Sequence, residues 1–217
     1  MNAEEKVTKI LARLGALYPE PRCALHFGSN FQLLIAVILS AQCTDARVNI
    51  VTEKLFAVAD TPQAILSLGY DGLVGYIYST GFYRNKANNI LRCCAQLLEE
   101  YNGIVPSDRE QLKQLAGVGE KTANVVFAEG FGGQAIPVDT HVGRLARRLG
   151  LSREKDPTKV MHDLERVVPQ DRYTDFHHYL ITHGRQVCAS ARPKCDECVL
   201  KDLCAYALGG ETTCTKS

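Results

Sequence analysis

The sequence lacks long apolar runs and carries almost no net charge. Its longest apolar stretch, residues 33–39, is far shorter than the roughly 20 residues of a membrane-spanning helix and predicts a buried helix instead. The first nine residues, MNAEEKVTK, contain acidic side chains where a secretion signal has positive charge and then an apolar stretch. We therefore expect a protein of the cytoplasm. Its formal net charge of +1 gives little support for nucleic-acid binding, which usually shows a basic excess.

Linkers rich in proline, glycine or serine are also missing, as are internal repeats and low-complexity segments. The strongest break in the chain is the Gly-Phe-Gly-Gly segment at residues 130–133. Nine cysteines are present, and a chain without an export signal keeps its thiols reduced. These cysteines are therefore expected to bind metal or to pack in the core rather than to form disulfides.

Strand-like alternation is absent as well, and apolar residues recur instead at helical spacing. The first such stripe consists of Val7, Ile10, Leu11, Leu14 and Leu17. Similar stripes begin near residues 90 and 160. A capping residue precedes a proline at residues 61–62 and 156–157, and Ser107 or Asp108 caps a further helix. We predict an all-α fold of about ten or eleven helices.

Four cysteines near the C-terminus have the spacing C-x6-C-x2-C-x5-C: Cys188, Cys195, Cys198 and Cys204. Thiols this close together can ligate one metal centre, either zinc or a [4Fe–4S] cluster. Zinc sites usually bring their cysteines in two C-x2-4-C pairs, and the x6 gap fits that arrangement poorly. The other cysteines show no ligand spacing, and most are expected to pack as small apolar side chains.

A glycine-containing segment at residues 115–123, Leu-Ala-Gly-Val-Gly-Glu-Lys-Thr-Ala, places Gly117 and Gly119 between a short helix and a longer one. Glycines allow positive φ and the close approach of a partner. The amides at the start of the second helix can hold a phosphate group without any side-chain charge, which suits a nearly neutral chain. Two glycines standing alone would equally well form a tight turn.

Together with this hairpin and the cysteine spacing, four further segments resemble the endonuclease III family of DNA glycosylases. They are residues 40–45 (SAQCTD), 81–87 (GFYRNKA), 137–142 (PVDTHV) and 183–185 (HGR). The resemblance implies a base-excision-repair enzyme that flips an oxidised pyrimidine out of duplex DNA, cleaves the base from its sugar and nicks the strand at the abasic site. It also favours a [4Fe–4S] cluster over zinc at the four cysteines.

The family fold implies two helical lobes with a DNA cleft between them. Residues 23–132 are expected to form a six-helix lobe, with a helix-hairpin-helix motif at about residues 108–130. Residues 1–22 and 133–217 are expected to form the second lobe, which carries the cluster loop at residues 188–204.

Two residues match the catalytic positions of the family. Lys121 matches the nucleophile, whose unprotonated amine attacks the sugar C1′ and leaves a Schiff base that permits β-elimination. Its alternative role is that of a surface lysine in the first turn of a helix. Asp139 matches the catalytic carboxylate, which could assist deprotonation of the lysine, stabilise positive charge on the sugar or shuttle the proton. Asp139 also fits an N-cap worth about 1 kcal/mol, and capping would fix its orientation.

Further residues are implied to contact DNA. Gln42 and Phe82 match two inserting residues, which fill the gap left by the flipped nucleotide and wedge the opposite base, although Phe82 could instead fold into the core. Asp45 matches a residue that lines the base pocket, or is a helix N-terminal acid favoured by the helix dipole. The hairpin and one basic side chain complete the set: Gly117, Val118, Gly119, Thr122 and Arg185.

Three positions depart from the family pattern. Ala116 replaces a proline, Glu120 stands where a basic residue is common, and Phe82 replaces an aliphatic side chain. We expect the first change to loosen the hairpin slightly and the second to weaken its attraction for phosphate. The third is expected to alter the preference for the opposing base.

Three other classes of protein agree less well with the sequence. A mismatch adenine glycosylase of the same superfamily would lack the lysine and carry an additional C-terminal domain. A non-catalytic DNA-binding protein would need neither Lys121 nor Asp139, and an iron–sulfur electron carrier would need no DNA hairpin. We therefore predict a monomeric, bifunctional DNA glycosylase and abasic-site lyase. Its partner is double-stranded DNA with damaged bases or abasic sites, in the nucleoid of a bacterial or archaeal-type cell.

Overall fold

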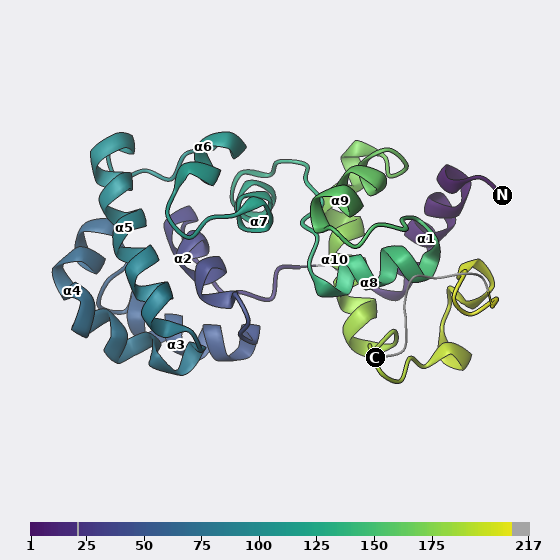
Figure 1. Ribbon diagram of the computed structural model, residues 1–217, viewed down its shortest axis with the longest axis horizontal. Coiled ribbons are helices and arrows are strands. Elements are labelled where there is room, and N and C mark those ends of the chain that lie inside the picture. Colours follow the sequence, from purple (N-terminus) through teal and green to yellow (C-terminus); the bar gives the residue numbers. More distant parts are fainter. Residues whose placement is uncertain (21, 210–217) are drawn as a thin grey trace. The chain divides into compact units, whose positions relative to one another are not determined.

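The computed structural model of the chain describes residues 1–20 and 22–209 (Figure 1). Within these ranges it contains ten α-helices, four short 3-10 helices and no strand, so the all-α prediction is confirmed. No helix in the described ranges combines the length and hydrophobicity that a membrane crossing requires. The chain divides into two compact units, residues 23–133 and residues 1–22 together with 134–217.

The unit of residues 23–133 is built around the predominantly apolar helix α2 (Asn30–Ser40). Its other helices are α3 (Asp45–Phe56), α4 (Pro62–Ile77), η1 (Tyr78–Thr80), α5 (Tyr83–Tyr101), α6 (Arg109–Gln114) and α7 (Glu120–Phe131). Every residue from 33 to 39 is buried, as the sequence predicted, because α2 packs against α3, α5 and α7. The helix α4 lies along α5 and bends at Gly69, whose φ is +66° (Figure 1). The hairpin between α6 and α7 is therefore held on a continuous core.

The second unit joins the N-terminal helix to the C-terminal half of the chain. Its elements are α1 (Ala3–Leu17), α8 (Thr140–Leu149), α9 (Pro157–Glu165), η2 (Gln170–Arg172), α10 (Tyr173–Gln186), η3 (Cys195–Glu197) and η4 (Lys201–Leu203). The helix α10 packs against both α1 and α8. Most of the predicted α1 stripe is buried, but Leu17, at the end of the helix, is 44% exposed. Arg13 of α1 donates a hydrogen bond to the carbonyl of Val199 (2.8 Å), so α1 also supports the cysteine-containing loop.

Seven of the ten described α-helices begin with a side chain that accepts a hydrogen bond from the first helical turn. The caps predicted at Thr61 and Asp156 are confirmed, and Asp108 rather than Ser107 caps α6. The remaining three helices, α5, α7 and α10, start without such a cap. Two of these uncapped starts coincide with segments that the sequence marks as functional.

Candidate functional site

The two glycines of the hairpin have different structural roles. Gly117 has φ +80°, and a side chain there would bring its Cβ to 2.9 Å from Cβ of Asn89. Gly119 has an ordinary φ of −93°, and a Cβ there would meet nothing within 4 Å. Gly117 is therefore required by the fold of the chain itself, whereas the bare backbone at Gly119 leaves open space in front of α7.

The backbone N–H groups at the start of α7 have no capping side chain. Its N-cap is Gly119, which offers no side chain to accept from the first turn, where Glu120, Lys121 and Thr122 lie. Such a helix end carries partial positive charge and exposed N–H groups, which together can bind an anion. Val118 is buried, and its N–H donates to the carbonyl of Leu115 (3.1 Å), so this residue anchors the hairpin to the core.

Lys121 is exposed in the first turn of α7. The pKa of the half-buried Cys23 thiol is raised to about 11, chiefly by burial. The carboxylates of Glu129 and Asp45 contribute to this increase, whereas a backbone hydrogen bond at Leu25 and the charge of Lys121 oppose it. Glu129 was not among the residues predicted from the sequence. It lies on the same helix as Lys121, about two turns further along and roughly 80° around its axis.

The two departures in the hairpin are compensated by neighbouring side chains. The N–H of Ala116 donates to Oε1 of Gln96 (2.7 Å), and a proline at this position would have no N–H to donate. Nε2 of the Gln96 side chain donates to the carbonyl of Gln114 (3.2 Å), so Gln96 bridges the turn. Glu120 forms an ion pair with Lys113 (3.2 Å) across the hairpin. Its negative charge is therefore directed at Lys113 of α6.

Gln42 and Phe82 share a backbone conformation that is rare for residues with a side chain. Among the described residues, positive φ outside glycine occurs at Gln42 (+51°), Phe82 (+47°) and Asn102 (+53°). Asn102 is a helix C-cap, where this conformation is common. The other two have no such explanation, and strained residues of this kind cluster at functional sites. Phe82 is 65% exposed, which excludes the alternative that its ring folds into the core.

Asp45 lies in the first turn of α3, behind the N-cap Thr44, whose hydroxyl accepts from the N–H of Arg47 (3.3 Å). The Asp45 side chain is half-buried. An acid in this position interacts favourably with the helix dipole, as the sequence indicated. The charges of Asp45 and Lys121 have opposite effects on the pKa of the Cys23 thiol.

Asp139 is the N-cap of α8, as its sequence context predicted. Its Oδ1 accepts from the N–H of Val142 at 2.8 Å, which fixes the carboxylate at the start of the helix. The residue lines an open surface hollow that also includes the basic side chains of Arg147 and Lys155. The carboxylate therefore has a defined orientation in a positively charged setting.

His141 and Arg185 lie close to Asp139 in the same unit. Burial lowers the pKa of His141; the Asp139 carboxylate opposes this shift, and the guanidinium groups of Arg144 and Arg185 reinforce it. Nδ1 of His141 is 3.1 Å from a guanidinium nitrogen of Arg144, which itself donates to the carbonyls of Gly184 and Cys188. The predicted Arg185 is exposed next to this network.

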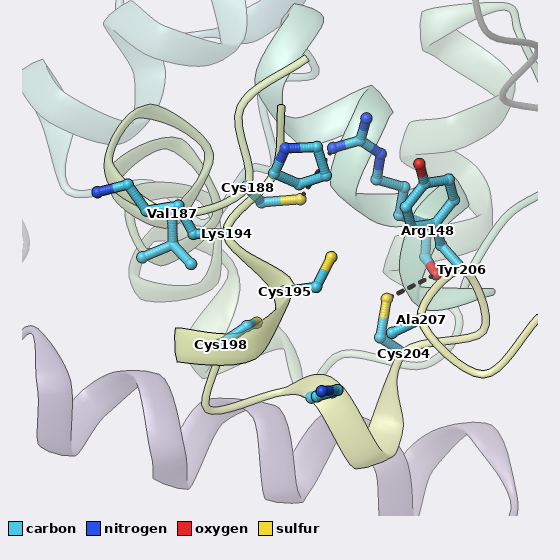
Figure 2. Close-up of a pocket in the computed structure, with 11 residues that line it drawn as sticks. Arg148, Val187, Cys188, Lys194, Cys195, Cys198, Cys204, Tyr206 and Ala207 are labelled. Atoms are coloured by element: carbon cyan, nitrogen blue, oxygen red, sulfur yellow. Dashed lines mark hydrogen bonds between the residues drawn. The ribbon is translucent and has the colours of Figure 1, made fainter. Parts of the chain in front are cut away.

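The four cysteines of the C-terminal loop line one cavity, together with Arg148, Lys194 and Tyr206 (Figure 2). Figure 2 shows their sulfur atoms gathered around this cavity. Between residues 187 and 209 the loop contains only the short helices η3 and η4. Its fold therefore depends on contacts from the surrounding elements and on whatever the thiols bind.

Arg148 is the main protein contact of this loop. It is 5% exposed, and its guanidinium donates to Sγ of Cys188 (3.2 Å) and to the carbonyls of Ala189 (2.8 Å) and Ser190 (2.7 Å). The guanidinium also lies over the ring of Tyr206, and the Arg148 carbonyl accepts from the Tyr206 N–H (3.0 Å). A single residue of α8 thus holds both ends of the loop.

A second chain of contacts reaches Cys198 from α10 and from the end of α1. Nε2 of His183 is 3.3 Å from Sγ of Cys198, and Nδ1 of His183 is 3.1 Å from the hydroxyl of Tyr18. Burial lowers the pKa of His183 to about 4, so the imidazole is neutral near pH 7. A thiolate can only accept, so a ligating Cys198 requires the proton on Nε2, with Tyr18 donating to Nδ1.

The donor set of this loop fits an iron–sulfur cluster. Four thiols surround one cavity, and three groups donate or can donate to the sulfurs: Arg148 to Cys188, and the Leu200 N–H (3.4 Å) and His183 to Cys198. Such hydrogen bonds to sulfur are a usual feature of thiolate-bound clusters. Among the described residues, no group of three or more His, Cys, Asp or Glu side chains is arranged to hold a single metal ion.

Comparisons with known proteins cover almost the whole chain. Residues 35–170 match the family of HhH-GPD superfamily base excision DNA repair proteins. The chain is 50% identical over 206 residues to Endonuclease III of Haemophilus influenzae, covering 95% of this chain and 97% of that protein. Endonuclease III of Escherichia coli strain K12 is 47% identical over the same shares.

Solved structures agree with these relatives. A trapped endonuclease III–DNA covalent intermediate has a TM-score of 0.92 at 42% identity and covers 96% of this chain and 99% of its own. A non-covalent endonuclease III–DNA complex gives the same TM-score and identity, with 98% of its own chain covered. A thermostable thymine-DNA glycosylase, 24% identical, shares the fold with a TM-score of 0.86.

Proposed function

Since the chain belongs to the endonuclease III family of the HhH-GPD superfamily, we propose that it is a base-excision-repair DNA glycosylase with abasic-site lyase activity. Its substrate is duplex DNA that contains an oxidised pyrimidine or an abasic site. The observation that carries the proposal is the start of α7. There, an exposed lysine stands in the first turn of an uncapped helix, directly behind a hairpin with open space in front of Gly119.

Lys121 acts as the nucleophile in this proposal. Its neutral amine attacks the sugar C1′, the bond from C1′ to the base breaks, and the base leaves with the bonding electron pair and takes up a proton. The C1′–O4′ bond then opens, with the proton lost by the amine passing to O4′, and an iminium forms between C1′ and the lysine nitrogen. This iminium acidifies the 2′ proton, and loss of that proton expels the 3′ phosphate by β-elimination. Because Lys121 is exposed in the free protein, exclusion of water from this amine comes from bound DNA.

Asp139 is proposed as the catalytic carboxylate. Its Oδ1 is held by the Val142 N–H (2.8 Å), so the carboxylate keeps one orientation while its other oxygen remains available. A carboxylate held in this way can stabilise positive charge on the sugar or accept the proton released by the lysine amine. Arg147 and Lys155, which line the same hollow, provide positive charge for the DNA backbone.

Gln42 and Phe82 are proposed to enter the duplex when the damaged nucleotide leaves it. Both stand at left-handed backbone positions on exposed loops, and an inserted ring offsets part of the unstacking cost of a few kcal/mol. The hairpin residues Gly117, Gly119 and Thr122 are proposed to hold a phosphate through the amides at the start of α7.

A [4Fe–4S] cluster held by Cys188, Cys195, Cys198 and Cys204 is the cofactor that we propose. When bound, it supplies structural cross-linking of the loop rather than a chemical step, because neither base cleavage nor β-elimination transfers an electron. Arg148 and His183 orient two of the ligand sulfurs. We further propose that the protein works as a monomer on the nucleoid of a bacterial or archaeal-type cell, in the cytoplasm.

The proposal is tested by borohydride trapping and strand nicking on duplexes with thymine glycol or with an abasic site. The wild-type protein should form a covalent complex with both duplexes, and Lys121→Ala should form none. Lys113→Ala is the matched control, because this second lysine of the hairpin is paired with Glu110 and Glu120 and should trap normally.

Two outcomes would contradict parts of the proposal. Equal trapping by the wild type and Lys121→Ala would remove Lys121 from the role of nucleophile. Tight DNA binding by the cluster-loaded wild type with no trapping on either duplex would favour a non-catalytic DNA-binding protein. Trapping with the abasic duplex alone would keep the lyase activity and reject thymine glycol as the substrate.

A further inference from the structure

Lys86 is a buried lysine whose position the catalytic proposal does not explain. It lies in the first turn of α5 and is 5% exposed. A cation at a helix N-terminus faces an unfavourable dipole, and no carboxylate among the described residues forms an ion pair with Lys86. Burial lowers the pKa of its ammonium group. Local helix formation therefore gives no reason for a lysine here.

The ammonium of Lys86 has two backbone partners from different segments. Nζ donates to the carbonyl of Leu39 (2.8 Å) near the end of α2, and to the carbonyl of Thr80 (2.8 Å) at the end of η1. Both carbonyls lie at C-terminal ends of helices, where the partial charge is negative and favours a cation. The C-terminal ends of two helices thus share one positive charge.

The contact with Leu39 completes the end of α2. The last four carbonyls of a helix have no intrahelical partner, and here each of them has one. Three are satisfied locally: Val37 by the Ser40 hydroxyl (2.8 Å), Ile38 by the Ala41 N–H (3.5 Å) and Ser40 by the Cys43 N–H (3.1 Å). The fourth, Leu39, depends on Lys86.

Each of the two carbonyls stands just before a residue with left-handed backbone. Gln42, φ +51°, follows Leu39 by three positions, and Phe82, φ +47°, follows Thr80 by two. The backbone N–H of Lys86 also donates to the carbonyl of Phe82 (3.1 Å). One residue therefore holds the base of both loops and contacts the second loop twice.

We propose that Lys86 is a positioning residue for base extrusion, which ties the Gln42 loop to the Phe82 loop so that both side chains enter the duplex together. The inference rests on the proposed glycosylase function and on insertion of these two side chains. Without the ammonium, two buried carbonyls lose their partner and each loop relaxes independently. Small misplacements of inserting or reacting groups have large effects on rate.

The test uses the full-length, cluster-loaded protein and Lys86→Met, which keeps the length of the side chain and removes both hydrogen bonds. A duplex carries thymine glycol next to 2-aminopurine, whose fluorescence rises on unstacking. We expect the single-turnover rate of base excision to fall on the order of 10- to 100-fold, and the rate of the fluorescence increase to fall with it. Cleavage at an abasic site should fall much less, because no base has to be unpaired there.

A double-mutant cycle separates positioning from stability. If Lys86 acts through the two loops, Lys86→Met should lose most of its effect in a protein that already carries Gln42→Ala and Phe82→Ala. Leu97→Ala, in the same core and three turns further along α5, is the matched stability control and should leave the extrusion signal unchanged. Lys86→Gln, whose amide can still donate, should recover part of the rate and serves if Lys86→Met fails to fold.

The outcomes distinguish the two proposals. An equal fold-loss from Lys86→Met with and without Gln42 and Phe82, or an equal loss from Leu97→Ala, would reduce Lys86 to a packing residue and overturn the inference. Failure of the wild-type protein to excise thymine glycol or to trap on either duplex would instead reject the proposed function, and the inference with it.

Discussion

In the unit of residues 23–133, two segments that carry candidate DNA-contacting residues open a helix without a capping side chain. Phe82 is the N-cap of α5 and Gly119 is the N-cap of α7, and neither side chain accepts from the first helical turn. In the other unit, the candidate catalytic carboxylate is itself a cap: Asp139 accepts from Val142, and the cysteine loop is held by Arg148.

The two units are therefore expected to respond differently to substitution. In residues 23–133 the proposed binding groups are mostly amides and exposed side chains, so a change at Gly119 or Phe82 should weaken DNA binding and leave stability almost untouched. In the second unit the functional side chains also carry structural hydrogen bonds, so a simple truncation confuses loss of chemistry with loss of structure.

Replacement of Asp139 should separate its two roles. Asp139→Asn keeps an oxygen that can accept from the Val142 N–H, so the melting temperature should stay unchanged while the excision rate falls by about 100-fold or more. Asp139→Ala should lose activity and also about 1 kcal/mol of stability through loss of the cap. Single-turnover kinetics and thermal unfolding measure the two effects. A near-normal rate for Asp139→Asn would leave this residue only its capping role.

Loss of the cluster should affect one unit far more than the other. Cys198→Ala is expected to reduce bound iron and to lower the melting temperature on the order of 10 °C, because the loop at residues 187–209 contains no α-helix of its own. Hydrogen exchange should rise in this loop and stay unchanged in α6 and α7. Cys93→Ala, at a buried cysteine in the other unit, is the control and should retain iron. A uniform increase in hydrogen exchange in both units would show that the cluster stabilises both of them, which would contradict this prediction.

The two hairpin glycines should respond in opposite ways to the same substitution. Gly117→Ala should lower stability by about 1–2 kcal/mol, because of its φ of +80° and the 2.9 Å approach to Asn89. Gly119→Ala should leave the melting temperature unchanged and weaken duplex binding about tenfold, the equivalent of one lost charge-assisted hydrogen bond. Thermal unfolding and fluorescence anisotropy distinguish them. Unaltered DNA affinity in Gly119→Ala would remove α7 from the phosphate contact.

The smallest effect is expected at the position where the family proline is missing. Ala116→Pro should change the free energy of unfolding by less than about 1 kcal/mol, because the stiffening of the unfolded chain by proline offsets the lost hydrogen bond to Gln96. Gln96→Ala should be at least as destabilising, since it removes both contacts that bridge the turn. Clear stabilisation by Ala116→Pro would show that the alanine does loosen the hairpin, as its sequence suggested.

Much of this molecule follows from local sequence patterns. The buried helix at residues 33–39, the caps Thr61 and Asp156, and the role of Asp139 as an N-cap are set by neighbours within a few positions, so they could be predicted. The spacing of the four cysteines likewise placed them on one loop, and they line one cavity.

Other features could not be read from the sequence because they depend on partners far along the chain. Leu39 and Lys86 are 47 residues apart, and the acceptor is a backbone carbonyl, which leaves no trace in the residue types. The left-handed backbone of Gln42 and Phe82 could not be predicted either, because neither residue type favours this conformation. The ion pair of Glu120 with Lys113 likewise joins two helices across the hairpin, and the effect of Glu120 on phosphate binding stays a prediction.

The division of the chain into units has a consequence for the order of events during synthesis. Residues 23–133 are contiguous and can fold as soon as they leave the ribosome. The helix α1 is synthesised before α10, against which it packs. Its apolar side chains Val7, Ile10 and Leu14 can therefore be buried only after α10 has been made. At about 5–20 residues per second this delay lasts roughly ten seconds or more. During that interval the nascent α1 exposes an apolar stripe, which chaperones can bind and protect.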